Sequence, residues 1–325
     1  MRCTPEARAA ALRDIDARNL RRRRTPAEDG RVNFCSNDYL GLARDPAVAA
    51  AMAEAAQRYG AGSGASHLVS GHGAEHEALE RELAEFTGRA RALVFSTGYM
   101  ANLGVLAALA DKRDLLLADE LNHASLIDAA RLVRSPLNLR YPHGDATAAR
   151  ALLDAHAPGG GAFIVTDGVF SMDGDLAPLP ALAAAARAHD AWLVVDDAHG
   201  IGVVGATGGG CCEHFGLDAR AAPVLVGTFG KALGSFGAFV AGDDDVIELL
   251  VQRARSYIFT TALPPAVAAA TRRALRIVRD EPWRREALHA RIAQFRDGAA
   301  RRGLAVMDST TPIQPWVLGD EATAL

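Results

Sequence analysis

The stretch 191-AWLVVDDAHG-200 decides the fold class and raises the question of function. Five apolar residues run directly into Asp196 and Asp197, and His199 follows. An unbroken apolar run of this length is typical of a strand that is buried on both faces of a parallel sheet. A carboxylate at the end of such a strand is costly unless a cation or hydrogen-bond donors compensate it. The stretch therefore predicts a buried strand with a polar site at its carboxyl end.

The same pattern recurs along the chain from about residue 92. Short apolar runs are separated by helical patterns or turns: ALVF (92–95), DLLLA (114–118), AFIVT (162–166), VLVGT (224–228) and GAFVA (237–241). This alternation indicates an α/β fold with a mostly parallel central sheet and helices on both faces. Because ligands bind beyond the carboxyl ends of the strands in such sheets, the polar residues after each run are the candidate site.

Composition argues against several classes of protein. The chain has 325 residues, half of them hydrophobic, and a net charge of −4, which does not suggest a broad nucleic-acid surface. No apolar run approaches the ~18 residues of a membrane span, and the N-terminus lacks a secretory apolar core. The cysteines, Cys3, Cys35, Cys211 and Cys212, form no C-x-x-C pair and read as thiols of a reducing compartment. We expect a cytoplasmic protein that binds neither nucleic acid nor membrane.

Three regions are expected along the chain. Residues 1–35 form an N-terminal helix and an arm, residues 36–262 a large domain, and residues 263–325 the start of a smaller α/β domain. The last region is helical with arginine-rich faces, and 312-PIQPWVLG-319 within it is strand-like. A basic cluster at 21–24 is either a solvated terminal segment or an anchor for an anionic substrate.

Two of the strand ends carry residues suited to phosphate and carbonyl chemistry. The stretch 96-STGYMAN-102 begins a helix, and the free N–H groups and dipole of a helix N-terminus favour an anion. Lys231, in 226-VGTFGKALGSFG-237, lies between glycines after an apolar run. A desolvated lysine has a lowered pKa and forms a Schiff base with a carbonyl, whereas the alternative is an exposed lysine in a turn. Thr228 is suited to donate to a phosphate.

The carboxylate at the end of the opening stretch also has two interpretations. Asp196 either forms a structural salt bridge or pairs with the protonated pyridine nitrogen of pyridoxal phosphate (PLP), which needs such a partner to act as an electron sink. His123, after another apolar run, either stacks on a planar cofactor or is an ordinary core or surface histidine.

One motif points to a metal but is set aside. The stretch 72-HGAEH-76 matches the H-x-x-E-H zinc pattern, which needs both histidines on an established helix. Glycines flank His72, so we expect the helix to begin near Ala74 and to stop at Gly88. No metal site is predicted.

Several motifs act in combination over nearly the whole chain. They are SNDYLGL, GAGSGASHLVSG, FSTGYMANL, LNHASLID, TDGVFSMDGDLAPL, VDDAHGIGVVG, GTFGKALGSFGAFVAG and YIFTTALPP. Together they resemble the α-oxoamine synthases, a family of PLP enzymes of fold type I. DDAHG, GTFGKALGSFGAFVA and FTTALPP are most similar to the members that join L-alanine to pimeloyl-CoA, or to pimeloyl carrier protein, in biotin synthesis. Another α-oxoamine synthase, such as one resembling glycine C-acetyltransferase, is the alternative.

The resemblance implies a role for each candidate residue. Lys231 would bind PLP as a Schiff base and act as acid and base, and the pyridine nitrogen would pair with Asp196. His199 would meet the phenolic oxygen, and His123 would stack on the ring. Further implied contacts are Ser171 and Asn37 near ring and substrate, Thr97, Gly98, Tyr99 and Thr228 around the phosphate, Arg21 at the distal carboxylate of the acyl chain, and Ser63, Gly64, Thr260 and Thr261 from the partner chain of a homodimer.

The chain departs from the family pattern in two places. The family's C-terminal domain continues well beyond Leu325 and carries an arginine that clamps the amino-acid carboxylate, and this sequence offers no matching residue. The segment between Arg24 and Phe34 is shorter than usual and lacks an early strand. We therefore expect a truncated small domain, and a PLP-binding chain without activity is the second alternative.

Overall fold

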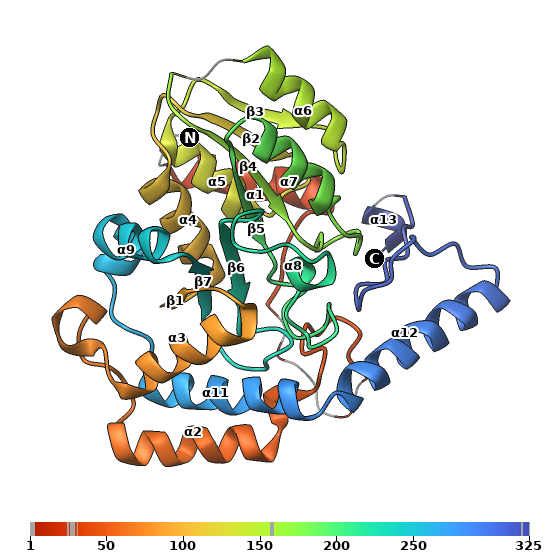
Figure 1. Cartoon of the computed structure of the whole chain (residues 1–325). Coiled ribbons are helices and arrows are strands. Elements are labelled where there is room, and N and C mark those ends of the chain that lie inside the picture. Colours follow the sequence, from red (N-terminus) through yellow and green to blue (C-terminus); the bar gives the residue numbers. More distant parts are fainter. Residues whose placement is uncertain are drawn as a thin grey trace.

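The computed structural model describes residues 4–24, 26, 30, 32–156, 159–319 and 321–324. Within these residues, seven strands form one sheet in the order β1-β7-β6-β5-β4-β2-β3 (Figure 1). The strands are β1 (Arg91–Phe95), β2 (Leu115–Asp119), β3 (Asn138–Tyr141), β4 (Ala162–Asp167), β5 (Trp192–Asp196), β6 (Val224–Thr228) and β7 (Ala238–Gly242). The predicted α/β class is confirmed.

Helices precede, separate and follow these strands. In chain order they are α1 (Pro5–Ala17), η1 (Leu42–Arg44), α2 (Pro46–Tyr59), η2 (His67–Gly71), α3 (Ala74–Thr87), α4 (Gly98–Leu109), α5 (Ala124–Val133), α6 (Ala146–Ala155), α7 (Leu179–Ala188), α8 (Cys211–His214), α9 (Asp244–Arg253), α10 (Arg255–Ile258), α11 (Pro265–Asp280), α12 (Trp283–Arg301) and α13 (Glu321–Ala324). None of the helices in the described ranges is both long and apolar enough to cross a membrane.

Strand direction follows from the connections between strands. β2, β3, β4, β5 and β6 pair in parallel, and each crossover contains a helix. β7 is antiparallel to β6, because only the turn of residues 229–237 connects the two strands. On its other side, β7 is also antiparallel to β1. The sequence analysis did not predict β3. Its four residues, NLRY, form no apolar run, and only Tyr141 is fully buried.

Apolar side chains cover both faces of the sheet, as the unbroken runs predicted. Leu116, Val165 and Val194 belong to one core cluster with α4, α5 and α9. Leu117 and Leu193 point to the opposite face and pack with α6 and α7. The strands are therefore held between two layers of helices, and their polar ends reach the surface only at the edges of the sheet.

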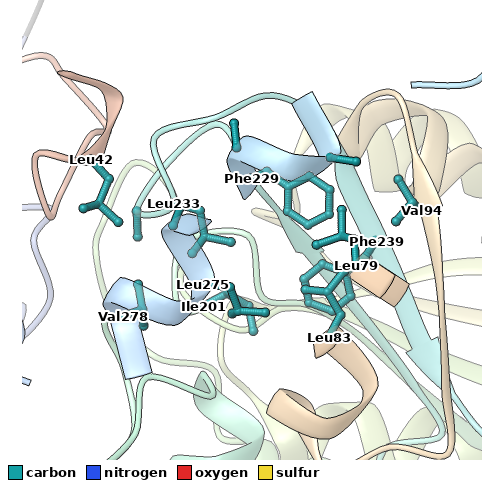
Figure 2. Close-up of a cluster of buried hydrophobic side chains, with 14 of the residues drawn as sticks. Leu42, Leu79, Leu83, Val94, Ile201, Phe229, Leu233, Phe239, Leu275 and Val278 are labelled. Carbon is teal, nitrogen blue, oxygen red and sulfur yellow. The ribbon is translucent and has the colours of Figure 1, made fainter. Parts of the chain in front are cut away.

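A third cluster joins β1 and β7 to α2, α3 and α11, which lie below the sheet in Figure 1. Figure 2 shows Phe239 of β7 beside Leu79 and Leu83 of α3, and all three are wholly buried. α3 begins at Ala74 as predicted, and Gly88 ends it in the left-handed conformation with a φ of 64°.

The C-terminal part differs from the sequence prediction. α11 packs along α2 and α3, and α12 extends away from the body of the molecule (Figure 1). Residues 312–319, predicted as strand-like, form no strand in the described structure. Pro312 and Pro315 have no N–H group to donate to a ladder, so pairing is weakened. The neighbouring hydroxyls of Ser309 and Thr311 instead donate to the Gly174 carbonyl, at 2.7 and 2.9 Å.

We expect Leu79→Ala to lower the free energy of unfolding by about 2–5 kcal/mol, because it leaves a cavity in a closely packed cluster. Leu132→Ala is the matched control, since Leu132 is 57% exposed on α5, and its effect should stay within about 0.5 kcal/mol. Urea unfolding of both variants measures the difference. Equal losses would show that the α3 contact contributes little to the core.

Candidate active site

A cavity of about 280 Å³ opens at the carboxyl ends of the central strands. Parallel strands end at one edge of a sheet, so segments that are distant in the sequence meet there. The predicted residues that line the cavity are Asn37, Thr97, Gly98, Tyr99, His123, Asp196, His199, Thr228 and Lys231. Asp167, which directly follows the apolar run 162–166, also lines the cavity, as expected of a strand end. The other lining residues are Asn102, Ser125, Ala198, Gly230, Phe236 and Gly237, to which the sequence assigned no ligand contact.

The carboxylate of Asp196 is held by donors on two sides. Its Oδ1 accepts from the backbone N–H of Ala198 at 3.0 Å, and its Oδ2 accepts from Nδ2 of Asn102 at 2.6 Å. Asp196 is the last residue of β5, and Asn102 lies on the buried face of α4. Because both partners are fixed, the carboxylate has one orientation at the cavity wall. The sequence could have indicated Asn102, because it is a polar residue within the otherwise apolar helix α4.

Asn102 also connects Asp196 to His123. Its Nδ2 donates to Ser125 Oγ at 2.8 Å, and that hydroxyl lies 2.6 Å from Nδ1 of His123. The Ser125 N–H donates to the same ring nitrogen at 3.2 Å, so Nδ1 is the acceptor and Nε2 carries the hydrogen. His123 is the N-cap of α5, and this network fixes its ring at the cavity wall.

Asp167, at the end of β4, places a second carboxyl group beside the first. The two residues are paired in the parallel register of β4 and β5. Burial and the charge of Asp196 raise the pKa of Asp167, while the His123 N–H, which donates to its Oδ2 at 2.7 Å, and Lys231 oppose the rise. The cavity edge therefore concentrates acidic groups, and a cation is needed to balance them.

Lys231 supplies that cation from the turn between β6 and β7, and it is not the exposed turn lysine of the alternative interpretation. Burial lowers the pKa of its amine, and the charges of Asp196 and Asp167 oppose this shift. The turn is anchored from behind, where Ser235 Oγ lies 2.8 Å from Oγ1 of Thr271 on α11. An amine with a lowered pKa is reactive toward carbonyl groups.

The N-terminus of α4 forms a cradle that suits a phosphate. Thr97 is the N-cap, and its Oγ1 accepts from the Met100 N–H at 3.1 Å. A Cβ at Gly98 would lie 2.7 Å from Cγ2 of Thr228, so only glycine lets these two segments approach. Backbone N–H groups at a helix N-terminus bind anions. With the Lys231 amine and the Asp196 carboxylate in the same cavity, this donor set fits PLP.

Comparisons with known proteins identify the family. The model of the aminotransferase class I and II family matches residues 29–325. The chain is 59% identical over 328 residues to the 8-amino-7-oxononanoate synthase of Methylococcus capsulatus, which covers 98% of this chain and 84% of the relative. The chain belongs to the 8-amino-7-oxononanoate synthase family.

Solved structures of the wider class have the same fold. An 8-amino-7-oxononanoate synthase from Francisella tularensis is 33% identical with a TM-score of 0.74, over 86% of this chain and 78% of that one. A serine palmitoyltransferase from S. paucimobilis, solved with PLP and myriocin, is 33% identical with a TM-score of 0.80, over 85% of this chain and 69% of that one. The fold is that of PLP enzymes of fold type I, and PLP is the cofactor.

Other residues that the synthase resemblance implied do not line the cavity. Arg21 is paired with Asp16 at 3.0 Å on the N-terminal segment. Ser171 lies in the loop after β4 and is partly exposed. The segments of residues 63–65 and 260–263 run together, since Ser63 Oγ donates to the Leu263 carbonyl at 2.7 Å and the Ala262 N–H to the Ala65 carbonyl at 2.9 Å. These two segments carry Gly64, Thr260 and Thr261.

His72 and His76 of the zinc-like stretch lie outside the synthase cavity. His76 Nδ1 accepts from the Gly73 N–H at 3.0 Å, and its Nε2 lies 2.5 Å from the Leu263 carbonyl. His72 Nε2 lies 3.1 Å from a carboxylate oxygen of Glu77. These contacts tie the start of α3 to the segment before α11.

Asp197 is a buried acid next to Asp196, and it does not line the synthase cavity. Its Oδ2 accepts from the Cys211 N–H at 2.6 Å, and Oδ1 has no hydrogen-bond partner among the described residues. Burial raises the pKa of Asp197 to about 7, with a smaller contribution from Asp196. The folded chain therefore holds this proton more tightly than the unfolded chain does.

We expect the contribution of Asp197 to the free energy of unfolding to fall as pH rises from about 4 toward 7. Its raised pKa stabilises the folded chain while the carboxyl stays protonated there, and this stabilisation is lost as pH rises to the folded pKa. Asp197→Asn cannot titrate and keeps an acceptor for Cys211. The cost of this substitution should thus be smaller at pH 8 than at pH 4, by up to about 4 kcal/mol for about three pKa units. Urea unfolding at both pH values measures it, and an equal cost would contradict the raised pKa.

Proposed function

We propose that this chain joins L-alanine to a pimeloyl thioester, either pimeloyl-CoA or pimeloyl carrier protein, and releases CO₂ to give 8-amino-7-oxononanoate for biotin synthesis. The observation that carries the proposal is the partly buried Lys231 amine in one cavity with the Asp196 carboxylate, in a chain that is 59% identical to a synthase of this name. PLP, when bound, supplies an electron sink for the carbanion at the α-carbon of the amino acid.

Different residues of the chain carry out proton transfer, charge pairing and phosphate binding. Lys231, whose pKa burial lowers, is suited to take the α-proton of alanine and to return a proton after CO₂ leaves. Asp196, oriented by Asn102, holds a positive charge at the deep end of the cavity. The N–H groups at the start of α4 bind the phosphate, and His123 and His199 flank the ring.

The acyl substrate enters from the open side of the cavity. Asn37 is exposed on the lining and is placed to contact the substrate. From the resemblance to the family, we also propose that Ser171 approaches the substrate and that Arg21 binds its distal carboxylate. Residues 36–262 form the PLP domain in this proposal, and residues 263–325 begin the small domain.

We further propose a homodimer that works in the cytoplasm. Leu68 and Val69 of η2 and Phe259 after α10 are apolar side chains exposed by 51%, 79% and 69% on neighbouring elements. Exposed apolar side chains that gather in this way mark protein contacts, and here they adjoin the segments of residues 63–65 and 260–263. The free thiols of Cys211 and Cys212 suit a reducing compartment.

With PLP, L-alanine and pimeloyl-CoA, the purified chain should release CoA, and Lys231→Ala should lower the rate by about 10²–10⁴-fold because the proton acceptor is lost. Thiol release and mass spectrometry of the product measure this. Asp196→Asn should lower the rate by about 10–100-fold through loss of a charge-assisted bond.

Acetyl-CoA with glycine and palmitoyl-CoA with serine are the controls for other acyl transfers. Turnover of one of these pairs at a higher rate than the alanine pair would replace the proposed substrates. PLP binding without any thiol release would favour the inactive-chain alternative.

For the homodimer, we expect Val69→Asp to shift the mass measured by light scattering from two chains toward one, because a charge in an apolar contact is desolvated without a partner. Val32→Asp is the matched control, since Val32 is 80% exposed outside this surface. A single-chain mass for the unmutated protein would overturn this part of the proposal.

A further inference from the structure

A contact between a hydroxyl and an imidazole links the N-terminal segment to the cavity. The Tyr39 hydroxyl lies 2.7 Å from Nδ1 of His199, a residue 160 positions away in the sequence. His199 is buried and lines the cavity, which leaves its other ring nitrogen, Nε2, for the cavity side. None of the roles assigned above uses Tyr39.

The position of the Tyr39 hydroxyl is fixed by its surroundings. The Tyr39 ring packs against the core cluster that contains Leu42 and Leu233. In the same loop, Asp38 Oδ1 accepts from the Leu42 N–H at 2.8 Å. A Cβ at Gly234 would lie 2.2 Å from the Ala43 nitrogen, so this loop presses directly on the turn that carries Lys231. The hydroxyl therefore has no freedom to follow a moving imidazole.

The protonation states of Tyr39 and His199 leave two possible directions for the hydrogen bond between them. Burial raises the pKa of Tyr39, so its O–H is retained at physiological pH. Burial, with Lys231 and His123 nearby, lowers the pKa of His199 to about 3, so the imidazole is neutral and has one N–H. Either the hydroxyl donates to Nδ1 and Nε2 keeps the hydrogen, or the reverse holds and Nε2 presents a lone pair to the cavity.

The two arrangements differ in the acceptor of the one hydroxyl hydrogen of Tyr39. Oδ1 of Asn37 lies 3.3 Å from the Tyr39 oxygen and can accept the same hydroxyl hydrogen. The contact with His199 is the shorter one, at 2.7 Å, and if the hydroxyl donates there, the Asn37 amide satisfies the Tyr39 oxygen by exchanging its oxygen for its NH₂ group. In the reverse arrangement, Nε2 would oppose the phenolic oxygen of PLP with a second lone pair. Both arrangements satisfy Tyr39, but only the first presents an N–H to the cavity, where the proposed cofactor has an oxygen acceptor.

We propose that Tyr39 is a positioning residue that holds His199 in the tautomer with hydrogen on Nε2, so that an N–H faces the phenolic oxygen of the cofactor. This inference rests on the proposed function, because the phenolic oxygen of PLP is the acceptor that selects between the two tautomers. An N–H donor stabilises the ionised phenolic oxygen and keeps the proton affinity of the neighbouring nitrogen low.

The first test reads the tautomer on the full chain without PLP. In a protein with ¹⁵N-labelled histidine, the His199 signals are assigned by their absence in His199→Asn. We expect an unprotonated Nδ1 and a protonated Nε2 in the unmutated chain, and a mixture of tautomers in Tyr39→Phe, which keeps the ring and loses only the hydroxyl. Tyr59→Phe is the matched control, because Tyr59 donates to Glu75 at 3.5 Å, away from the cavity.

The second test uses the protein with PLP and the pH dependence of its visible absorbance. Tyr39→Phe should raise the pH midpoint by up to about one unit, in the same direction as His199→Asn. The double variant should move no further than His199→Asn alone, since both changes act through one imidazole. Tyr59→Phe should leave the midpoint unchanged.

A protonated Nδ1 in the unmutated chain would overturn the inference. A Tyr39→Phe variant with an unchanged tautomer and an unchanged pH midpoint would also overturn it. The same holds for a double variant whose midpoint shift equals the sum of the shifts of the two single variants. If the chain bound no PLP, the proposed function would fail, while the tautomer test would still decide the role of Tyr39.

Discussion

Burial of charge at one edge of the sheet is the constraint on which the site depends. Asp196 and Asp167 end adjacent strands and are both buried, and the Lys231 amine in the same cavity is partly buried. A low local dielectric makes each of these groups costly alone and strongly interacting together. The surrounding polar groups follow from this, because Asn102 and the backbone of Ala198 must be in place for the carboxylate to be tolerated. The same arrangement prepares a cavity for a cationic, electron-withdrawing ring.

The sequence was informative wherever a local pattern determines the outcome. Apolar runs predicted the buried strands, and the geometry of parallel sheets placed the residues after them, such as Asp196 and Lys231, at one cavity. β3 was missed because an edge strand with one buried residue has no apolar signal. The prediction of a strand at residues 312–319 was wrong. It relied on the apolar residues of this stretch and gave too little weight to its two prolines.

The rest of the site depends on tertiary contacts that no periodicity encodes. Asn102 and Tyr39 lie inside motifs that the sequence analysis quoted, yet their partners are 94 and 160 residues away. A hydrogen bond over such a separation leaves no trace in composition or spacing. The role of Arg21 stays a prediction from resemblance, and in the described structure its guanidinium pairs with Asp16.

The short connection between β6 and β7 limits how this protein can vary. The Phe229 N–H donates to the Gly237 carbonyl at 2.9 Å, so the turn that carries Lys231 is closed by the ladder itself. One inserted residue would slide β7 along β6 and exchange the faces of Phe239 and Val240, which belong to different core clusters. A one-residue shift of this register is therefore costly, although most surface loops tolerate changes in length. Substitutions change the position of the Lys231 amine at a lower cost than a single-residue insertion that shifts β7.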